Sequence, residues 1–201
     1  MKKLLAILLA ALMLLGLAAC ENDIDENPTI VGTWEGTVDL GKALKLAAQK
    51  DIYAPLLLDI TYTFNADGTY SATADKDSVE TMLDALVDVM IEAMYDPDMD
   101  IEAAVAAEGM TMEEFKEQFM DSMGMDVDQV MTNLTMNGVY KYEDGKLYST
   151  NDKESLDAGD YVEINYITLT TDTMTITDAE QDGENLSELI PDMFPMVFKK
   201  Q

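Results

Sequence analysis

The chain has no histidine, no arginine and a single cysteine, Cys20, among its 201 residues. Without a second thiol it cannot form an intrachain disulfide, and without imidazole it lacks the usual base that activates a nucleophile. Its 12 basic residues are all lysines and face 40 acidic residues, which gives a net charge of -28. Nucleic-acid binding requires basic side chains that neutralise phosphates, so this composition argues against a nucleic-acid partner.

Carboxylates are the remaining candidates for catalysis, but they are too numerous for one catalytic pair to be singled out. The composition therefore favours a binding protein over an enzyme. Length sets a second limit, because a chain of this size builds one sizeable core. We expect a single domain, preceded by segments that do not belong to its core.

Residues 1–19 have the pattern of a secretory signal peptide. Two lysines precede an uncharged run over residues 4–17 that is rich in leucine and alanine. The run is shorter than the roughly 20 residues that cross a bilayer, and the acidic Glu21 follows soon after it. We therefore expect residues 1–19 to be removed and to play no part in the fold.

The tetrapeptide Leu17-Ala18-Ala19-Cys20 resembles the lipobox of bacterial lipoproteins. The resemblance implies cleavage before Cys20 and attachment of diacylglycerol, often with a further acyl chain, to that cysteine. Two or more acyl chains hold a protein stably on a bilayer. Residues 20–29 are acidic and are predicted to form a flexible tether. The expected location is the extracytoplasmic face of a cell membrane or envelope, with the bilayer as a partner through this anchor.

Residues 30–201 are expected to form one mainly β domain. Apolar and polar side chains alternate in residues 30–40 and 56–73, as in half-buried strands. Asp-Gly pairs at 67–68 and 144–145 predict the turns of two β-hairpins. A short helix is also expected over residues 41–52.

The C-terminal part of the chain predicts one more hairpin over residues 161–177 and a closing edge strand over residues 194–200, with Pro195 at its start. In this hairpin the apolar side chains change phase near Asn165, which predicts a β-bulge. The residues that define the two phases are Val162 and Ile164 before the change, and Ile167 and Leu169 after it.

Residues 77–134 predict a helical insertion between the two Asp-Gly hairpins. Apolar residues follow helical spacing, Asp77 with Glu80 predicts an N-cap, and Thr111 with Glu114 predicts a capping box. Most of the 16 methionines lie in or beside this insertion. Methionine fills irregular gaps between short helices and a sheet, and it also forms adaptable apolar lids, so both roles stay open.

Gly32-Thr33-Trp34, followed by short hairpins and a closing C-terminal strand, resembles the lipocalin or calycin pattern, in particular the lipocalin-like domains of bacterial lipoproteins. The resemblance implies an antiparallel β-barrel of about eight strands, closed or partly open. Trp34 would fill one end of the barrel, and Gly32, which has no side chain, would allow neighbouring groups to approach closely. Many lipocalins pack an arginine over the tryptophan, a place that only Lys199 or Lys200 can take here. The insertion has no place in a standard lipocalin.

The resemblance also implies that the barrel binds an apolar or amphipathic small molecule. An alternative is an interaction or scaffold module of the cell envelope that presents the helical insertion to a partner protein. The residues expected to line the barrel interior and to contact a small molecule are Tyr62, Phe64, Tyr70, Tyr140 and Tyr142.

A third alternative is calcium binding at a short run of acidic residues. The cluster departs from the EF-hand pattern, which has glycine and glutamate where this chain has Ile101 and Ala107. No other metal or cofactor is expected, apart from the acyl groups on Cys20. The candidate calcium ligands are Asp96, Asp98, Asp100 and Glu102.

Overall fold

The computed structural model describes residues 29–41, 55–95, 99–181 and 183–201. Four of the sequence predictions lie outside these residues. They are the signal peptide, the lipidated Cys20 with nearly all of the tether, most of the predicted helix at 41–52, and the candidate calcium ligands Asp96 and Asp98.

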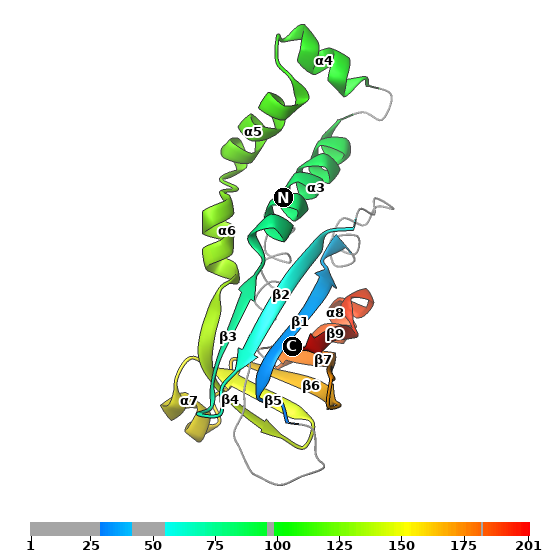
Figure 1. Ribbon diagram of the computed structural model, residues 1–201. Helices are drawn as coiled ribbons and strands as arrows, with labels where there is room; N and C mark the ends of the chain where they lie inside the picture. The colour runs from blue at the N-terminus through cyan, green and yellow to red at the C-terminus, as the bar shows by residue number, and fades with distance from the viewer. Residues whose placement is uncertain (1–28, 42–54, 96–98, 182) are drawn as a thin grey trace.

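The described residues form a closed antiparallel β-barrel of eight strands with a helical insertion, the lipocalin-like architecture predicted from the sequence (Figure 1). Consecutive barrel strands pair with one another, and the last strand closes the barrel on the first. A short ninth strand, β8 (Glu184–Asn185), pairs only with β7. The barrel strands are β1 (Gly32–Asp39), β2 (Leu57–Phe64), β3 (Thr69–Ala74), β4 (Met136–Glu143), β5 (Lys146–Thr150), β6 (Glu163–Leu169), β7 (Thr173–Gln181) and β9 (Met196–Lys200).

The two Asp-Gly turns lie where the sequence predicts them. Asp144 and Gly145 have φ angles of 52° and 75°, the left-handed pair that a tight turn between twisted strands requires. Gly68 has a φ of 81° in the turn between β2 and β3. The alternation predicted for the first strand is also confirmed, because Trp34 and Val38 are buried on β1.

The closing strand β9 is not an edge, which corrects one prediction. It pairs with β7 on one side and with β1 on the other. Pro195 is compatible with this central place because it precedes Met196, the first residue of the strand. A proline before the ladder removes none of the strand's hydrogen bonds.

The bulge predicted near Asn165 is present nearby but belongs to the partner strand. Tyr166 pairs with Asp178 and Ile167 pairs with Ile176, so β7 contains the extra residue, Thr177. β6 itself keeps one alternation along its length, and its inward positions include Glu163, Asn165 and Ile167.

The prediction that Val162 belongs to an inward apolar phase is therefore wrong. Val162 is 48 % exposed, and Ile164 points to the opposite face from Glu163 and Asn165. The hydrophobic pattern changes phase because two polar side chains of β6, Glu163 and Asn165, point into the barrel.

The insertion consists of four helices that project from one end of the barrel (Figure 1). α3 rises from the end of β3, α4 lies farthest from the barrel, and α5 and α6 lead back to β4. Lys116 of α5 joins the two sides of this arm through ion pairs with Asp84 at 3.0 Å and Asp88 at 2.8 Å. The helices are α3 (Lys76–Met94), α4 (Ile101–Ala107), α5 (Met112–Met123) and α6 (Val127–Leu134).

Helix caps follow the sequence prediction in α5 but not in α3. Thr111 and Glu114 form the predicted capping box, and Gly124 ends α5 with a φ of 67°. The N-cap of α3 is Asp75 instead of Asp77, because Asp75 has the extended backbone of a cap and accepts from the Ser78 amide at 2.9 Å. Asp77 lies in the first turn, where the helix dipole favours its charge.

Short helices that the sequence analysis did not predict complete the fold. They are α7 (Lys153–Ala158), α8 (Leu186–Leu189) and the 3-10 turn η1 (Pro191–Met193). None of the helices in the described part of the chain combines the length and the apolar character needed to cross a bilayer.

The up-and-down course of the strands gives the barrel two distinct ends. One end, called the Trp34 end, contains the start of β1, the β2–β3 turn and the end of β9. The other, called the insertion end, contains the end of β3, the start of β4, the start of β6 and the end of β7, and the helical arm leaves from it. These two ends are filled by different kinds of side chain.

Candidate ligand-binding site

The Trp34 end is filled by an aromatic ring whose neighbours satisfy its polar groups. Trp34 is fully buried, and its indole N–H donates to the carbonyl of Ile30 at 2.7 Å. The Nζ atom of Lys200 lies 5.0 Å from the Trp34 ring centroid and donates to the carbonyl of Thr29 at 3.2 Å. Of the two lysines expected to pack over Trp34, it is therefore Lys200 that does so.

Gly32 makes this arrangement sterically possible. Its φ of 135° lies in the region that favours glycine, and a Cβ there would lie 2.8 Å from Cε of Lys200. Nearby, the hydroxyl of Tyr140 donates to the carbonyl of Asn65 in the β2–β3 turn at 2.8 Å. The polar atoms of Trp34, Lys200 and Tyr140 at this end therefore all have partners.

The barrel interior brings together four of the five predicted lining residues. Tyr62, Phe64 and Tyr140 are fully buried and Tyr70 nearly so, whereas Tyr142 is half-buried and packs at the margin of the core. Phe64 and Tyr140 have ring centroids 5.1 Å apart, and Tyr70 lies 6.4 Å from each of these two rings. These rings form an aromatic wall that β2, β3 and β4 contribute.

A polar group points into the barrel from the insertion end of β5 and β6. Ser149 and Glu163 are cross-strand partners, and both are buried. Asn165 is fully buried two residues further along β6, and its amide Nδ2 donates to Oε1 of Glu163 at 2.8 Å. A carboxylate accepts hydrogen bonds, so this contact assigns the orientation of the Asn165 amide.

Two buried atoms in this region have no hydrogen-bond partner among the described residues. They are Oδ1 of Asn165 and the hydroxyl of Tyr62. A buried polar atom without a partner costs about 1–3 kcal/mol, and such atoms are rare enough in folded proteins to call for a specific explanation. The interior therefore holds one acceptor and one hydroxyl whose hydrogen-bonding capacity the described residues leave unused.

The tyrosine hydroxyls here remain protonated at neutral pH. Burial, followed by the negative charge of Glu163, raises the pKa of Tyr62 well above its ordinary value. The same two causes raise the pKa of Tyr70. The charge of Glu163 thus acts on both hydroxyls, and both are neutral groups able to donate a hydrogen bond.

A cavity of about 300 Å³ opens at the insertion end, beside this polar group. That volume lies at the lower end of the range for small-molecule sites. Gly138 helps to shape it, because a Cβ there would lie 2.8 Å from the Tyr70 ring and 2.5 Å from the carbonyl oxygen of Thr150. The lining includes Tyr70, Met136, Ser149, Thr150, Glu163 and Gln181.

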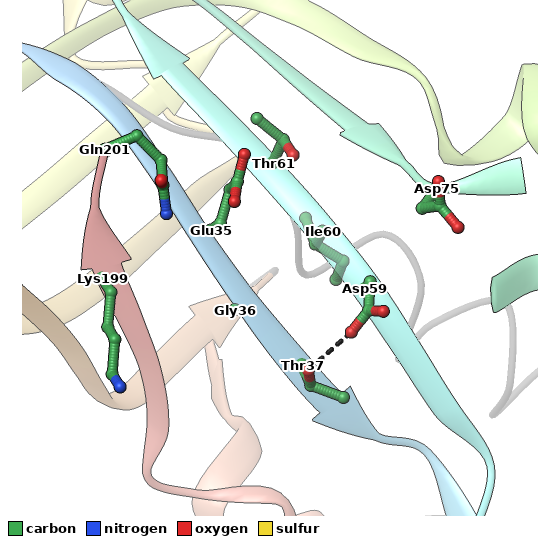
Figure 2. Close-up of a pocket in the computed structure, with 9 residues that line it drawn as sticks. All are labelled: Glu35, Gly36, Thr37, Asp59, Ile60, Thr61, Asp75, Lys199 and Gln201. Atoms are coloured by element: carbon green, nitrogen blue, oxygen red, sulfur yellow. Dashed lines mark hydrogen bonds between the residues drawn. The ribbon is translucent and has the colours of Figure 1, made fainter.

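A second cavity, of about 480 Å³, lies on the outer face of β1, β2 and β9 (Figure 2). Its acidic side chains Glu35, Asp59 and Asp75 are exposed to solvent. Thr37 donates to Asp59 at 2.5 Å, so part of the lining is already paired. Water satisfies exposed polar groups of this kind, and the smaller interior cavity is therefore the better candidate.

The acidic residues proposed for calcium do not form a cluster where the structure describes them. Asp100 is the N-cap of α4 and accepts from the Ala103 amide at 3.0 Å, and Glu102 is exposed in the first turn of that helix. Among the described residues, no three His, Cys, Asp or Glu side chains lie close enough together to hold a metal ion.

Sequence reasoning missed Ser149, Glu163 and Asn165. One signal was available for the two on β6: counting back in steps of two from Ile167 reaches Asn165 and then Glu163. The strand was instead assigned by hydrophobicity, which favours Val162 and Ile164 as inward residues.

Comparison of the chain with protein-family models, with curated proteins and with solved structures found no match. The assignment of the fold therefore rests on the strand order, the register and the closure of the barrel. The site rests on the burial and hydrogen bonding of its residues.

Proposed function

We propose that this chain is a membrane-anchored, extracytoplasmic binding protein whose barrel takes up an amphipathic small molecule at the insertion end. The observation that carries this proposal is the cavity of about 300 Å³ beside a buried polar group, in a barrel whose opposite end is filled by Trp34. The ring of Tyr70 and the side chain of Met136 offer apolar surface, and Ser149 and Glu163 offer polar surface. A ligand with an apolar body and a polar head matches this lining.

Lipidation of Cys20 completes the proposal and agrees with the position of the first described residue. Lys200 binds the carbonyl of Thr29, so the chain enters the barrel at the Trp34 end. An anchor on Cys20 would therefore attach to the end of the barrel opposite the cavity. The cavity would then stay accessible to molecules arriving from the side away from the attachment point.

Native mass spectrometry of the Cys20→Ser chain, purified from its own host, tests ligand binding. The expected result is a small-molecule adduct on the folded protein. A matched variant, Ser149→Trp, fills the cavity and should lose the adduct, whereas Thr61→Trp, on the lining of the outer cavity, should keep it. Absence of any adduct, or its persistence in Ser149→Trp, would count against the proposal.

The intact mass of the unmodified chain from the same host tests the anchor. Removal of residues 1–19 together with a gain in mass that matches diacylglycerol is expected, and Cys20→Ser should abolish the gain. An unmodified Cys20 or an uncleaved N-terminus would contradict the lipoprotein assignment.

A second candidate function is docking of an envelope protein on the helical arm. The observation that favours it is the exposure of large apolar side chains near the far end of the arm, where Met94 is 57 % and Met99 is 48 % exposed. A photo-crosslinking residue at position 99 should then capture a partner in the host. The control is the same residue in place of Val197, which is similarly exposed on the barrel; equal crosslinking from both positions would exclude a specific arm contact.

A further inference from the structure

We propose that the insertion-end cavity selects ligands whose head is a cationic hydrogen-bond donor, such as a primary ammonium, which binds among Glu163, Asn165 and Tyr62. This inference rests on the proposed function and makes it more specific. It concerns the class of head group that the buried side chains accept.

The barrel interior has hydrogen-bonding capacity that the described residues leave unused. Oδ1 of Asn165 only accepts hydrogen bonds, and it has no donor among the described residues. The Nδ2 group of the same side chain is already used by Glu163. A ligand that supplies N–H donors satisfies Oδ1, whereas a carboxylate or phosphate head brings acceptors only and leaves it unpaired.

Glu163 and Asn165 lie on one face of β6, beside the cavity. Glu163 lines the cavity, and Asn165 lies on the same face of the strand two residues further on. The hydroxyl of Tyr62 is buried and without a partner in this region, where Glu163 exerts its charge on it. An ammonium has three donors on a compact head, one for each of Oδ1, the Tyr62 oxygen and the Glu163 carboxylate.

Glu163 also places a buried carboxylate in the lining of the cavity. Burial, followed by the negative charge of Glu163, raises the pKa of both Tyr62 and Tyr70. A cation entering the cavity is attracted by this charge, and an anion is repelled in a region of low dielectric constant. The net charge of -28 on the whole chain acts in the same direction over longer distances.

Calorimetric titration with three eight-carbon amphiphiles tests the inference on the Cys20→Ser chain. Octylammonium, octanol and octanoate share one apolar body and differ in the head. We expect octylammonium to bind at least tenfold more tightly than either of the others. The preference should fall below twofold in Glu163→Gln and in Asn165→Leu, because each variant removes one part of the head site.

Glu35→Gln is the matched control, since it removes one carboxylate from the outer cavity. It should leave the tenfold preference intact; loss of the preference in this control would place the site outside the barrel and overturn the inference. If Glu163→Gln does not fold, Asn165→Leu gives the answer, because it keeps the carboxylate and removes the unpaired acceptor.

The remaining outcomes separate the two proposals. Equal binding of all three amphiphiles overturns the inference on the head group and leaves the proposed function standing. Absence of binding by all three overturns both at this site. A crystal structure grown with octylammonium that shows only an ordered water on Asn165 Oδ1 and the Tyr62 hydroxyl also overturns the inference, because water then meets the need of the buried atoms.

Discussion

The two ends of the barrel differ in the chemistry of their buried side chains. At the Trp34 end a large ring fills the space, and the polar atoms of Trp34, Lys200 and Tyr140 each have a partner. Towards the insertion end a carboxylate and an amide point inward, and Oδ1 of the amide, Asn165, lacks a partner among the described residues. The Trp34 end thus has satisfied polar groups, whereas the insertion end retains the energetic cost of an unpaired buried atom, which the proposed ligand would relieve.

The sharpest test of this division is removal of the ring at the Trp34 end. Trp34→Ala should lower the free energy of unfolding by about 3–5 kcal/mol, as for other buried aromatic residues. Urea denaturation followed by circular dichroism measures it. Val197→Ala, at an exposed position on β9, should change stability by less than about 0.5 kcal/mol.

The Trp34→Ala variant should also retain the ligand preference under conditions where it is folded. Loss of that preference together with stability would contradict the separation of roles between the two ends.

High pH should destabilise the barrel interior around Tyr62 and Tyr70 in particular. The pKa values of Tyr62 and Tyr70 are raised in the folded chain, whereas unfolded tyrosine titrates near pH 10. The contribution of these two phenols to the free energy of unfolding is therefore complete below about pH 10. It is lost as the pH rises through their raised pKa values in the folded chain. Each group should lower the free energy of unfolding by about 1.4 kcal/mol per pH unit in that window.

The measurement is urea unfolding between pH 8 and 12, with Tyr62→Phe and the Tyr62→Phe/Tyr70→Phe double variant beside the unmodified chain. The slope should decrease stepwise from the unmodified chain to the double variant. The same slope in all three proteins would show that these phenols do not govern the pH dependence.

Much of this architecture follows from local patterns in the sequence. Short stretches of sequence are enough to predict the Asp-Gly turns at 67–68 and 144–145 and the capping box at Thr111. These features depend on backbone sterics and hydrogen bonds between residues that are close in sequence. The pairing of β9 on both sides depends on closure of the whole barrel, and for that reason Pro195 suggested an edge strand.

The candidate site was predictable only in part, for a physical reason. The aromatic wall follows from hydrophobic alternation, but Glu163 and Asn165 violate that rule by pointing inward. Patterns of hydrophobicity describe what favours folding, and departures from them are expected at functional sites. The misassigned phase at Val162 and Ile164 marks the strand that carries the candidate site.

A smaller effect is expected from the cation over the Trp34 ring. Lys200→Ala should cost about 0.5–1 kcal/mol of unfolding free energy, the usual value of a partly exposed cation–π contact. Lys200→Arg should restore most of it, since arginine also stacks on aromatic faces. Thermal denaturation of the two variants gives the comparison. Equal loss in both would show that Lys200 stabilises this end through its other contacts and not through the stacked cation.

The smallest effect on stability, and the clearest contrast, is expected from an apolar insertion end. Glu163→Leu/Asn165→Leu removes both partners of a buried polar pair, so stability should change by less than about 1 kcal/mol or increase. The preference for octylammonium should disappear at the same time. Urea denaturation measures the stability and calorimetry measures the preference, both on one preparation. A decrease of several kcal/mol in the free energy of unfolding would mean that Glu163 and Asn165 stabilise the fold.

The pairing of Trp34 with Lys200 also determines when the barrel can close during folding. β1 meets β9 across nearly the whole domain, so this contact forms only after the intervening strands have been brought together. Contacts between residues so distant in sequence slow folding, because the chain loses conformational entropy before the stabilising contact can form. Trp34 is the chain's single tryptophan, and its fluorescence should therefore report the moment of closure without any added label.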